Sequence, residues 1–309
     1  MDQTFSETIQ FTPNSNEKEI LVNFKTEILP LILKETNYDE LWGYQLTSTG
    51  QFYQDDITNC LIFKFLKANE FDLTKTQDQL TNTLKWRKQF KPLKAAYLET
   101  HDPKFKDIGV ITYYEDLPEI ITWNLYGQTS SSSASPGELF EDIDSFLRYR
   151  ISLMEHSLQL CQFTSLPLSK ISQVHDYKNV SFLRFDPRVK KASKVIIKTF
   201  QDYYPELLER KFFVNVPILA KWIYDLIVLT WLPTETSRKF KLLSDPTRLV
   251  HDLGTDKVPV SYGGVGKELK EQDYHFSSTG EGENKVKMTE YTKFLIENVY
   301  SLELADTVE

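Results

Sequence analysis

A histidine and a tyrosine lie two positions apart in Gln173-Val174-His175-Asp176-Tyr177, a run that is predicted to be a β-strand. Side chains two apart in a strand project from the same face, so His175 and Tyr177 are expected to lie together. Imidazole and phenol groups can ligate a metal ion or exchange a proton, but they also form ordinary structural hydrogen bonds. The opposite face carries Ser172, Val174 and Asp176, so neither face is plainly apolar. The residues alone leave both interpretations open.

An arginine interrupts the apolar stripe of the helix that is predicted over Gly137–Cys161. Arg150 lies three or four residues from stripe members on either side, and the stripe consists of Ile143, Phe146, Leu147, Leu153 and Met154. By contrast, Arg148 follows Asp144 by four residues, which predicts a solvent-side ion pair. An inward guanidinium needs an anionic partner, because an uncompensated buried charge is strongly destabilising. That partner is either a protein carboxylate or the anionic group of a bound ligand.

Familiar catalytic and metal-binding patterns are missing from the sequence. It has no G-x-S-x-G elbow, no Walker loop and no H-E-x-x-H, and none of its 5 histidines has a second His or Cys at metal-ligand spacing. The cysteines, Cys60 and Cys161, cannot form a metal cluster or a disulfide framework, and a reducing cytosol suits them best. We therefore expect neither an enzyme nor a structural zinc site.

Composition narrows the class of partner. A net charge of −8 argues against a nucleic-acid partner, and 40% apolar with 26% charged residues is ordinary for a globular protein. The longest apolar stretch, near Leu226–Leu232, is far shorter than the ~20 residues that a membrane-spanning helix needs, and the amino terminus has no targeting pattern. We expect any membrane contact to be made from one side.

The first part of the chain, residues 1–106, is predicted to be a helical lobe, because apolar residues recur at helical spacing and strand-like alternation is missing. Its clearest helices are Cys60–Asn69 and Asp72–Phe90, the second with Asp72 as its cap and Pro92 as its stop.

From residue 107 to 266 the pattern changes to short β-rich runs that alternate with helices. Strands are predicted at Ile108–Tyr113, Ile120–Tyr126, Ile171–Tyr177, Phe212–Val216 and Phe240–Leu243, and helices at Gly137–Cys161, Pro187–Tyr203 and Ile218–Leu232. This alternation predicts an α/β domain with a mostly parallel or mixed sheet, and the run Thr129–Gly137 reads as a loop. The tail, 267–309, is expected to dock a final helix, Met288–Leu302, through Phe294, Leu295, Val299 and Tyr300.

The predicted helix Ile218–Leu232 has an unusually wide apolar surface. Such a helix is either fully buried or a lid over a hydrophobic cavity that can meet a membrane surface.

Several segments together resemble the CRAL-TRIO, or Sec-fourteen-like, lipid-transfer family. The segment 60–91 is similar to its amino-terminal helical module, and core landmarks are matched in order and spacing by Asp176-Tyr177-Lys178, Tyr203-Tyr204-Pro205-Glu206, Lys211–Pro217 and Val258–Gly264. The resemblance implies a helical lobe before an α/β domain whose mixed sheet floors an apolar pocket. The helix at Ile218–Leu232 would be the gate of that pocket.

Further segments resemble a fungal branch of this family in which haem b is bound through a strand tyrosine; they are Tyr38–Tyr44, Thr122–Gln128, Arg148–Arg150 and Gln173–Tyr177. The resemblance implies Tyr177 as the axial ligand of ferric iron, His175 beside it or as a possible ligand, and Tyr126, Arg150 and Lys211 around the macrocycle. Because phenolate is a hard anionic ligand, the ferric state would be favoured and globin-like oxygen binding is not expected. Asn179 stands where the family has glycine, and Asn tolerates the positive φ of that turn.

Family members that carry phosphatidylinositol share a glutamate and a lysine, which Glu206 and Lys239 match. The resemblance thus implies haem binding in haem or oxidant-stress homeostasis or, as the alternative, phosphatidylinositol transfer at membranes, with one pocket making the ligands compete. It implies a cytoplasmic protein that associates peripherally with the endoplasmic reticulum (microsomal) membrane. A catalase-like reading is disfavoured because no acid–base pair can be placed beside the iron.

Overall fold

A mixed sheet is the centre of the computed structural model, which describes residues 13–105, 107–114, 119–127, 139–180, 187–216, 239–274 and 287–301. Its spatial order is β3-β4-β5-β6-β7, with β3 antiparallel to β4 and the other neighbours parallel. The strands are β3 (Gly109–Tyr114), β4 (Glu119–Leu125), β5 (Ile171–Asp176), β6 (Leu208–Val214) and β7 (Phe240–Leu243). Together with the helical lobe before it, this sheet confirms the predicted fold class.

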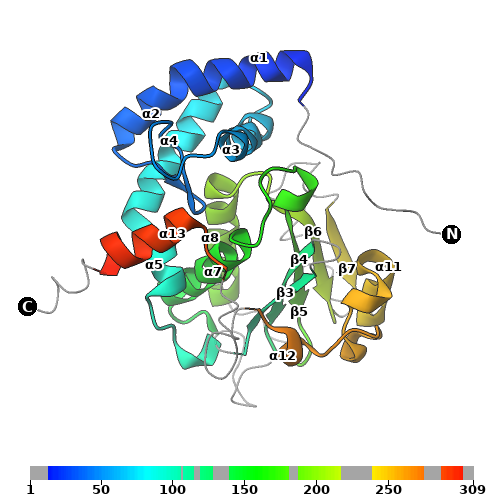
Figure 1. Cartoon of the computed structure of the whole chain (residues 1–309). Coiled ribbons are helices and arrows are strands. Elements are labelled where there is room, and N and C mark those ends of the chain that lie inside the picture. The colour runs from blue at the N-terminus through cyan, green and yellow to red at the C-terminus, as the bar shows by residue number, and fades with distance from the viewer. Residues whose placement is uncertain are drawn as a thin grey trace, which may run out of the picture.

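The amino-terminal lobe lies against one end of the sheet (Figure 1). Its helices are α1 (Ser15–Asn23), α2 (Leu29–Thr36), α3 (Asp55–Ala68), α4 (Leu73–Phe90) and α5 (Pro92–Tyr97), with a π-helical turn at Phe24–Ile28. As predicted, Asp72 caps α4 by accepting a hydrogen bond from the Lys75 N–H at 3.0 Å. A two-stranded hairpin, β1 (Glu40–Leu41) and β2 (Tyr44–Gln45), was not predicted because its strands are too short to show alternation.

Helices cover the two faces of the sheet (Figure 1). Helices α7 (Ile143–Leu158) and α8 (Pro187–Tyr203) cover the face that carries Ile120, Ile171 and Phe213, which we call the α7 face. Helices α11 (Leu249–Leu253) and α12 (Leu269–Gln272) cover the opposite face, where Trp123 and Val174 belong to a second apolar cluster. Residues alternate between these faces along each strand, so the register decides which side chains can form a site.

A buried ion-pair network joins the lobe to the α/β domain. The Arg87 guanidinium in α4 donates to both carboxylate oxygens of Glu40 at 2.9 and 2.7 Å, and to those of Glu155 in α7 at 2.7 and 3.0 Å. The hydroxyl of Tyr204 donates to Glu155 at 2.6 Å. Because Arg87 is fully buried, these contacts fix helix α7 against the lobe.

Three sequence-based predictions need correction. Arg148 pairs with Glu99 rather than Asp144. Strand β6 begins at Leu208, before the predicted start at Phe212. In the terminal segment, α13 (Glu290–Leu295) continues as a π-helix, Ile296–Tyr300, and docks through Tyr291, Leu295 and Tyr300, whereas Phe294 and Val299 are 40% and 36% exposed.

Some predictions concern residues outside the described ranges, namely the loop at Thr129–Gly137 and the gate at Ile218–Leu232. Within the described ranges, no helix is long and apolar enough to cross a membrane.

Candidate functional site

The carboxyl ends of β4 and β5 bring three of the predicted residues together. Tyr126 and Tyr177 directly follow these strands, and their ring centroids are 5.3 Å apart. His175 lies in β5 with its ring centroid 5.6 Å from that of Tyr126. The period-two prediction for His175 and Tyr177 agrees with this arrangement, because the ring of Phe213 on β6 contacts both side chains.

Both ring nitrogens of His175 have partners in this structure. Nδ1 lies 3.0 Å from the Tyr126 hydroxyl and Nε2 lies 3.3 Å from the Gln173 side-chain oxygen. Burial holds the pKa of His175 well below its usual value, and the positive charges of Lys211 and Arg150 act in the same direction. The imidazole is therefore neutral, and it lies beside the phenols as a hydrogen-bonding group.

The two phenols are also held in their neutral form by their surroundings. Burial raises the pKa of Tyr177 well above its usual value, and the neighbouring Tyr126 adds to the rise, while the positive charge of Arg150 opposes it. The pKa of Tyr126 is raised by burial and lowered in part by Arg150. A phenolate at this site would therefore need a strong cationic partner.

Arg150 points inward from α7, as its place in the apolar stripe predicts, and is 3% exposed. Its Nε and Nη1 atoms have no hydrogen-bond partner within the described part of the chain. The sequence left two partners open for Arg150, a protein carboxylate or the anionic group of a ligand. No carboxylate of the described residues forms an ion pair with Arg150. The guanidinium is thus a buried cation that can receive an anionic ligand group.

Lys211 supplies a second cation on the α7 face. Its Nζ lies over the rings of Phe213 and Phe240, 5.6 and 5.7 Å from their centroids. Burial lowers the pKa of Lys211 to about 7, and the charge of Arg150 contributes. Arg150 and Lys211 have no ion-pair carboxylate among the described residues, so this part of the α7 face is electropositive when Lys211 is protonated.

The floor beside His175 is polar, which sequence reasoning missed. Asn124 pairs with His175 in the β4–β5 register, and Thr122 pairs with Gln173. The Asn124 Oδ1 and Thr122 Oγ1 atoms are buried and have no partner within the described ranges. The alternation of β4 could have revealed these positions, since each is an even number of residues from Tyr126.

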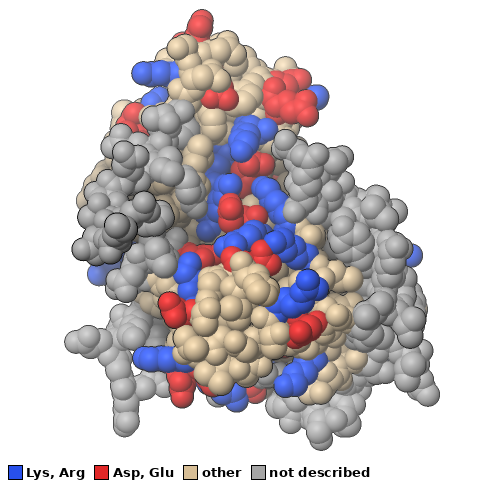
Figure 2. Space-filling view, turned by 90° about the vertical axis from the view of Figure 1, so that its right-hand side faces the viewer, with Lys and Arg blue, Asp and Glu red and all other residues tan. Residues whose placement is uncertain are grey.

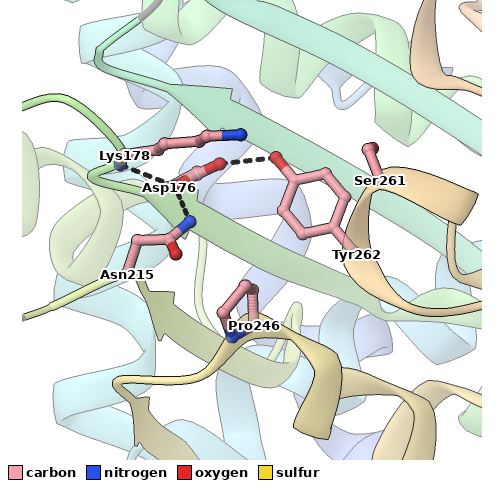
Figure 3. A pocket seen from close by; sticks show the side chains of 6 residues that line it. All are labelled: Asp176, Lys178, Asn215, Pro246, Ser261 and Tyr262. Atoms are coloured by element: carbon pink, nitrogen blue, oxygen red, sulfur yellow. Dashed lines mark hydrogen bonds between the residues drawn. The ribbon is translucent and has the colours of Figure 1, made fainter.

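The opposite face at the same strand end holds a different group. A cavity of about 100 Å³ lies here. Its lining residues are Asp176, Lys178, Asn215, Pro246, Ser261 and Tyr262 (Figure 3). The Asp176 carboxylate accepts hydrogen bonds from the Lys178 N–H, the Asn215 amide and the Tyr262 hydroxyl at 2.8, 2.6 and 2.5 Å. This carboxylate is satisfied by the protein itself, so its role is to hold the strand ends in place.

Glu206 and Lys239 lie at the other end of the sheet, near the amino ends of β6 and β7. Lys239 Nζ donates to the Leu208 carbonyl at 3.0 Å, and the Glu206 carboxylate lies 3.4 Å from Lys67 Nζ. Burial lowers the pKa of Lys239, and the charge of Glu206 partly offsets this.

Figure 2 shows that Lys and Arg alternate with Asp and Glu in a central band on one face of the molecule. The structure therefore places Tyr126, His175 and Tyr177 at one end of the sheet and Glu206 and Lys239 at the other. Lys211 lies between these groups, because its main-chain N–H donates to the Lys239 carbonyl at 2.8 Å.

Family models match most of the chain. The CRAL/TRIO domain model matches residues 106–264 and the model of the CRAL/TRIO N-terminal domain matches residues 17–82. These matches cover both the sheet with its two candidate sites and most of the helical lobe.

Individual relatives agree with the family models. The chain is 48% identical over 236 residues to the phosphatidylinositol transfer protein SFH5 of Kluyveromyces lactis, an alignment covering 75% of this chain and 77% of that protein. It is 40% identical over 267 residues to SFH5 of Saccharomyces cerevisiae strain S288c, covering 82% and 88%. A crystal structure of Sfh5 superposes with a TM-score of 0.82 at 36% identity, covering 96% of this chain and 99% of the other. The chain therefore belongs to the CRAL/TRIO family and is a homologue of the Sfh5 phosphatidylinositol transfer proteins.

Proposed function

We propose that this chain binds haem b, with the phenolate oxygen of Tyr177 as the axial ligand of ferric iron. The observation that carries the proposal is Arg150, a guanidinium that is 3% exposed and has two nitrogens without a partner in the described ranges. Haem presents two propionate carboxylates at the edge of a flat apolar ring. Arg150 and Lys211 are suited to receive them, and the aromatic rings around Tyr177 are suited to contact the macrocycle.

The donor set fits this group chemically. Ferric haem would supply a Lewis-acidic iron that favours a hard phenolate ligand. Tyr177 would provide the oxygen, and its high pKa in the apoprotein means that ligation releases a proton. Because its Nδ1 lies 3.0 Å from the Tyr126 hydroxyl, His175 would remain a neighbour of the phenolate, although direct ligation by His175 stays a second possibility of the proposal.

The visible spectrum and iron content of the purified protein test the proposal. Protein made with adequate haem supply is expected to show a Soret band and iron. Tyr177→Phe retains the ring but removes the ligand oxygen, so haem occupancy should fall sharply. His175→Ala should alter the spectrum with partial retention, and Tyr97→Phe in α5 is the matched control that should change neither. The proposal fails if the wild-type protein has neither Soret band nor iron, or if Tyr177→Phe keeps an unchanged spectrum.

A second candidate function is phosphatidylinositol transfer, which the names of the relatives favour. Glu206 and Lys239 lie close enough to influence each other at the amino ends of β6 and β7. A carboxylate and an ammonium can hydrogen-bond to the hydroxyls and the phosphate of an inositol head group. A carrier of this lipid would contact membranes peripherally, as we expect for this chain.

Transfer of labelled phosphatidylinositol between vesicles tests this second function. Lys239→Ala is expected to lower the transfer rate about tenfold or more while the protein stays folded, since a charged hydrogen bond to phosphate is lost. Lys241→Ala is the matched control, because Lys241 lies two residues away and pairs with Asp252. Equal rates for the wild type and Lys239→Ala would remove Lys239 from the head-group site.

A further inference from the structure

Lys64 is a buried lysine in α3 that belongs to neither candidate site. It is 1% exposed, and its ammonium donates to the main-chain carbonyl oxygens of Ser169 and Glu206 at 3.0 and 2.9 Å. No carboxylate of the described residues is an ion-pair partner of Lys64. Burying an ammonium against neutral carbonyl groups is costly, so the contact calls for a reason beyond filling space.

The two carbonyls lie where strands β5 and β6 begin. Ser169 lies two residues before the start of β5 and Glu206 lies two residues before the start of β6, and the Ile171 N–H donates to the Leu207 carbonyl at 2.8 Å. Lys64 therefore connects the helical lobe to both strand starts at once. Strand starts that are fixed in this way also fix the side chains that project from them.

Glu206 itself has an unfavourable backbone conformation. Its φ of 55° lies in the left-handed region, which is disfavoured for a residue with a Cβ atom. Such a conformation persists only when surrounding contacts hold it, and the Lys64 ammonium is a direct contact of the Glu206 main chain. Without that contact, the residue can relax toward a negative φ and redirect its carboxylate.

The lobe holds the residues just before Glu206 as well. The ring of Trp86 stacks on Tyr203 with centroids 4.3 Å apart, and the indole N–H of Trp42 donates to the Tyr203 carbonyl at 3.3 Å. The Tyr204 hydroxyl donates to Glu155. Lys64 continues this series of contacts to the main chain of Glu206 itself.

We propose that Lys64 is a positioning residue of the inositol head-group site, which holds the left-handed turn at Glu206 so that its carboxylate faces the ligand. The proposal rests on the second proposed function, phosphatidylinositol transfer. Lys64 is covered by protein and acts through the main chain, whereas Lys67 reaches the Glu206 carboxylate from the surface, where its side chain is 49% exposed. Lys64 therefore acts on lipid recognition without touching the lipid.

A double-mutant cycle on vesicle transfer of labelled phosphatidylinositol tests the proposal. Lys64→Met removes the donor at nearly constant volume, and Glu206→Gln weakens the group that it positions. We expect each single variant to lower the transfer rate about tenfold and the double variant to be no slower than Glu206→Gln alone. A purely structural role of Lys64 would instead lower transfer by the product of the two single effects.

Controls separate the possible failures. Lys25→Met removes another lobe lysine, which bonds to Asp55 and Asn59, and should leave transfer unchanged. If the wild type transfers no labelled phosphatidylinositol, the proposed lipid function falls. If the wild type transfers and Glu206→Gln is equally fast, Glu206 is not a head-group residue and the positioning role of Lys64 falls with it. If Glu206→Gln is slow but Lys64→Met is normal, or if the double variant shows independent losses, only the positioning role is wrong. Should Lys64→Met not fold, Lys64→Leu, which also removes the donor, enters the same cycle with the same expectations.

Discussion

At the scale of single residues, Arg150 connects the sequence to the site most directly. Its place in an apolar stripe predicts that the guanidinium faces inward, and the structure confirms this with 3% exposure. The sequence could not predict the anionic partner of Arg150. That partner depends on whether the neighbouring elements place a carboxylate beside the guanidinium, which local sequence patterns do not show. A cation left without a carboxylate destabilises the apoprotein and is retained when a ligand uses it.

Arg150→Met should therefore separate stability from ligand binding. Methionine fills a similar volume without a charge, so the apoprotein is expected to be as stable as the wild type or to melt a few degrees higher, for a gain of about 1–2 kcal/mol. Haem retention should weaken, while the axial-ligand spectrum is unchanged, because Arg150 would act on the propionates. Melting curves of apoprotein and haem-loaded protein measure both effects. A large fall in the apoprotein Tm would instead make Arg150 a structural residue.

At the scale of elements, a segment is predicted well when apolar spacing defines its bounds and less well when main-chain pairing does. Helix Pro187–Tyr203 and strand Phe240–Leu243 were predicted with their observed bounds, because apolar spacing defines them. Strand β6 begins earlier than predicted because Leu208 pairs with Ile171 and Lys211 with Gln173, with an irregular register between the two pairs. Main-chain pairing does not require apolar side chains. The docking face of the last helix was wrong in part, since a π-helical turn changes the residues per turn and rotates Val299 outward.

The turns that follow β4 and β5 keep Tyr126 and Tyr177 adjacent. A Cβ atom on Gly127 would lie 1.6 Å from the Lys178 carbonyl oxygen, so these two turns approach as closely as only glycine permits. Asn179 has a φ of 67°, which confirms the positive φ predicted for this turn. Together the two positions bring the strand ends to their observed separation.

Gly127→Ala should disturb both tyrosines at once. The new methyl group forces the turns apart, and we expect a loss of about 2–3 kcal/mol of stability together with weaker haem retention. Asn179→Gly is the matched control in the facing turn; it keeps the positive φ and should be neutral or slightly stabilising. Chemical denaturation and the Soret band measure the two consequences. Wild-type behaviour of Gly127→Ala would show that the strand ends can separate without cost.

Helix α7 also contributes a pH-dependent contact to α5. The His156 Nε2 lies 2.8 Å from the Ala96 carbonyl, and burial lowers the pKa of His156 to about 4. In the unfolded chain His156 has its ordinary pKa near 6.5, so below this pH the unfolded chain binds a proton that the native protein does not. Stability is present above pH 6.5 and is lost as pH falls towards 4, by up to about 3 kcal/mol. His156→Gln should flatten this part of the pH–Tm curve; an unchanged slope would assign the loss to other groups, His175 among them.

At the scale of the whole molecule, the helical lobe supports the CRAL/TRIO domain. The Arg87 network ends on α7, which carries Arg150, and Lys64 ends on the main chain of Glu206. The Trp86–Tyr203 stack holds the chain three residues before Glu206. None of these contacts follows from local sequence patterns, because each joins residues that are distant along the chain. The resemblance to a family predicts the two domains, whereas only the structure identifies which side chains join them.

The Arg87 network should decide whether lobe and domain unfold together. Arg87 is fully buried between Glu40 and Glu155, so Arg87→Met leaves two carboxylates without their cation and is expected to cost about 3–5 kcal/mol. Arg148→Met is the matched control: its pair with Glu99 is about a quarter exposed on each side, and its loss should cost under about 1 kcal/mol. Calorimetry of the wild type is expected to give one transition, and Arg87→Met a lower Tm with a separate transition for the lobe. If Arg87→Met melts in one transition at the temperature of Arg148→Met, the network does not couple the two parts.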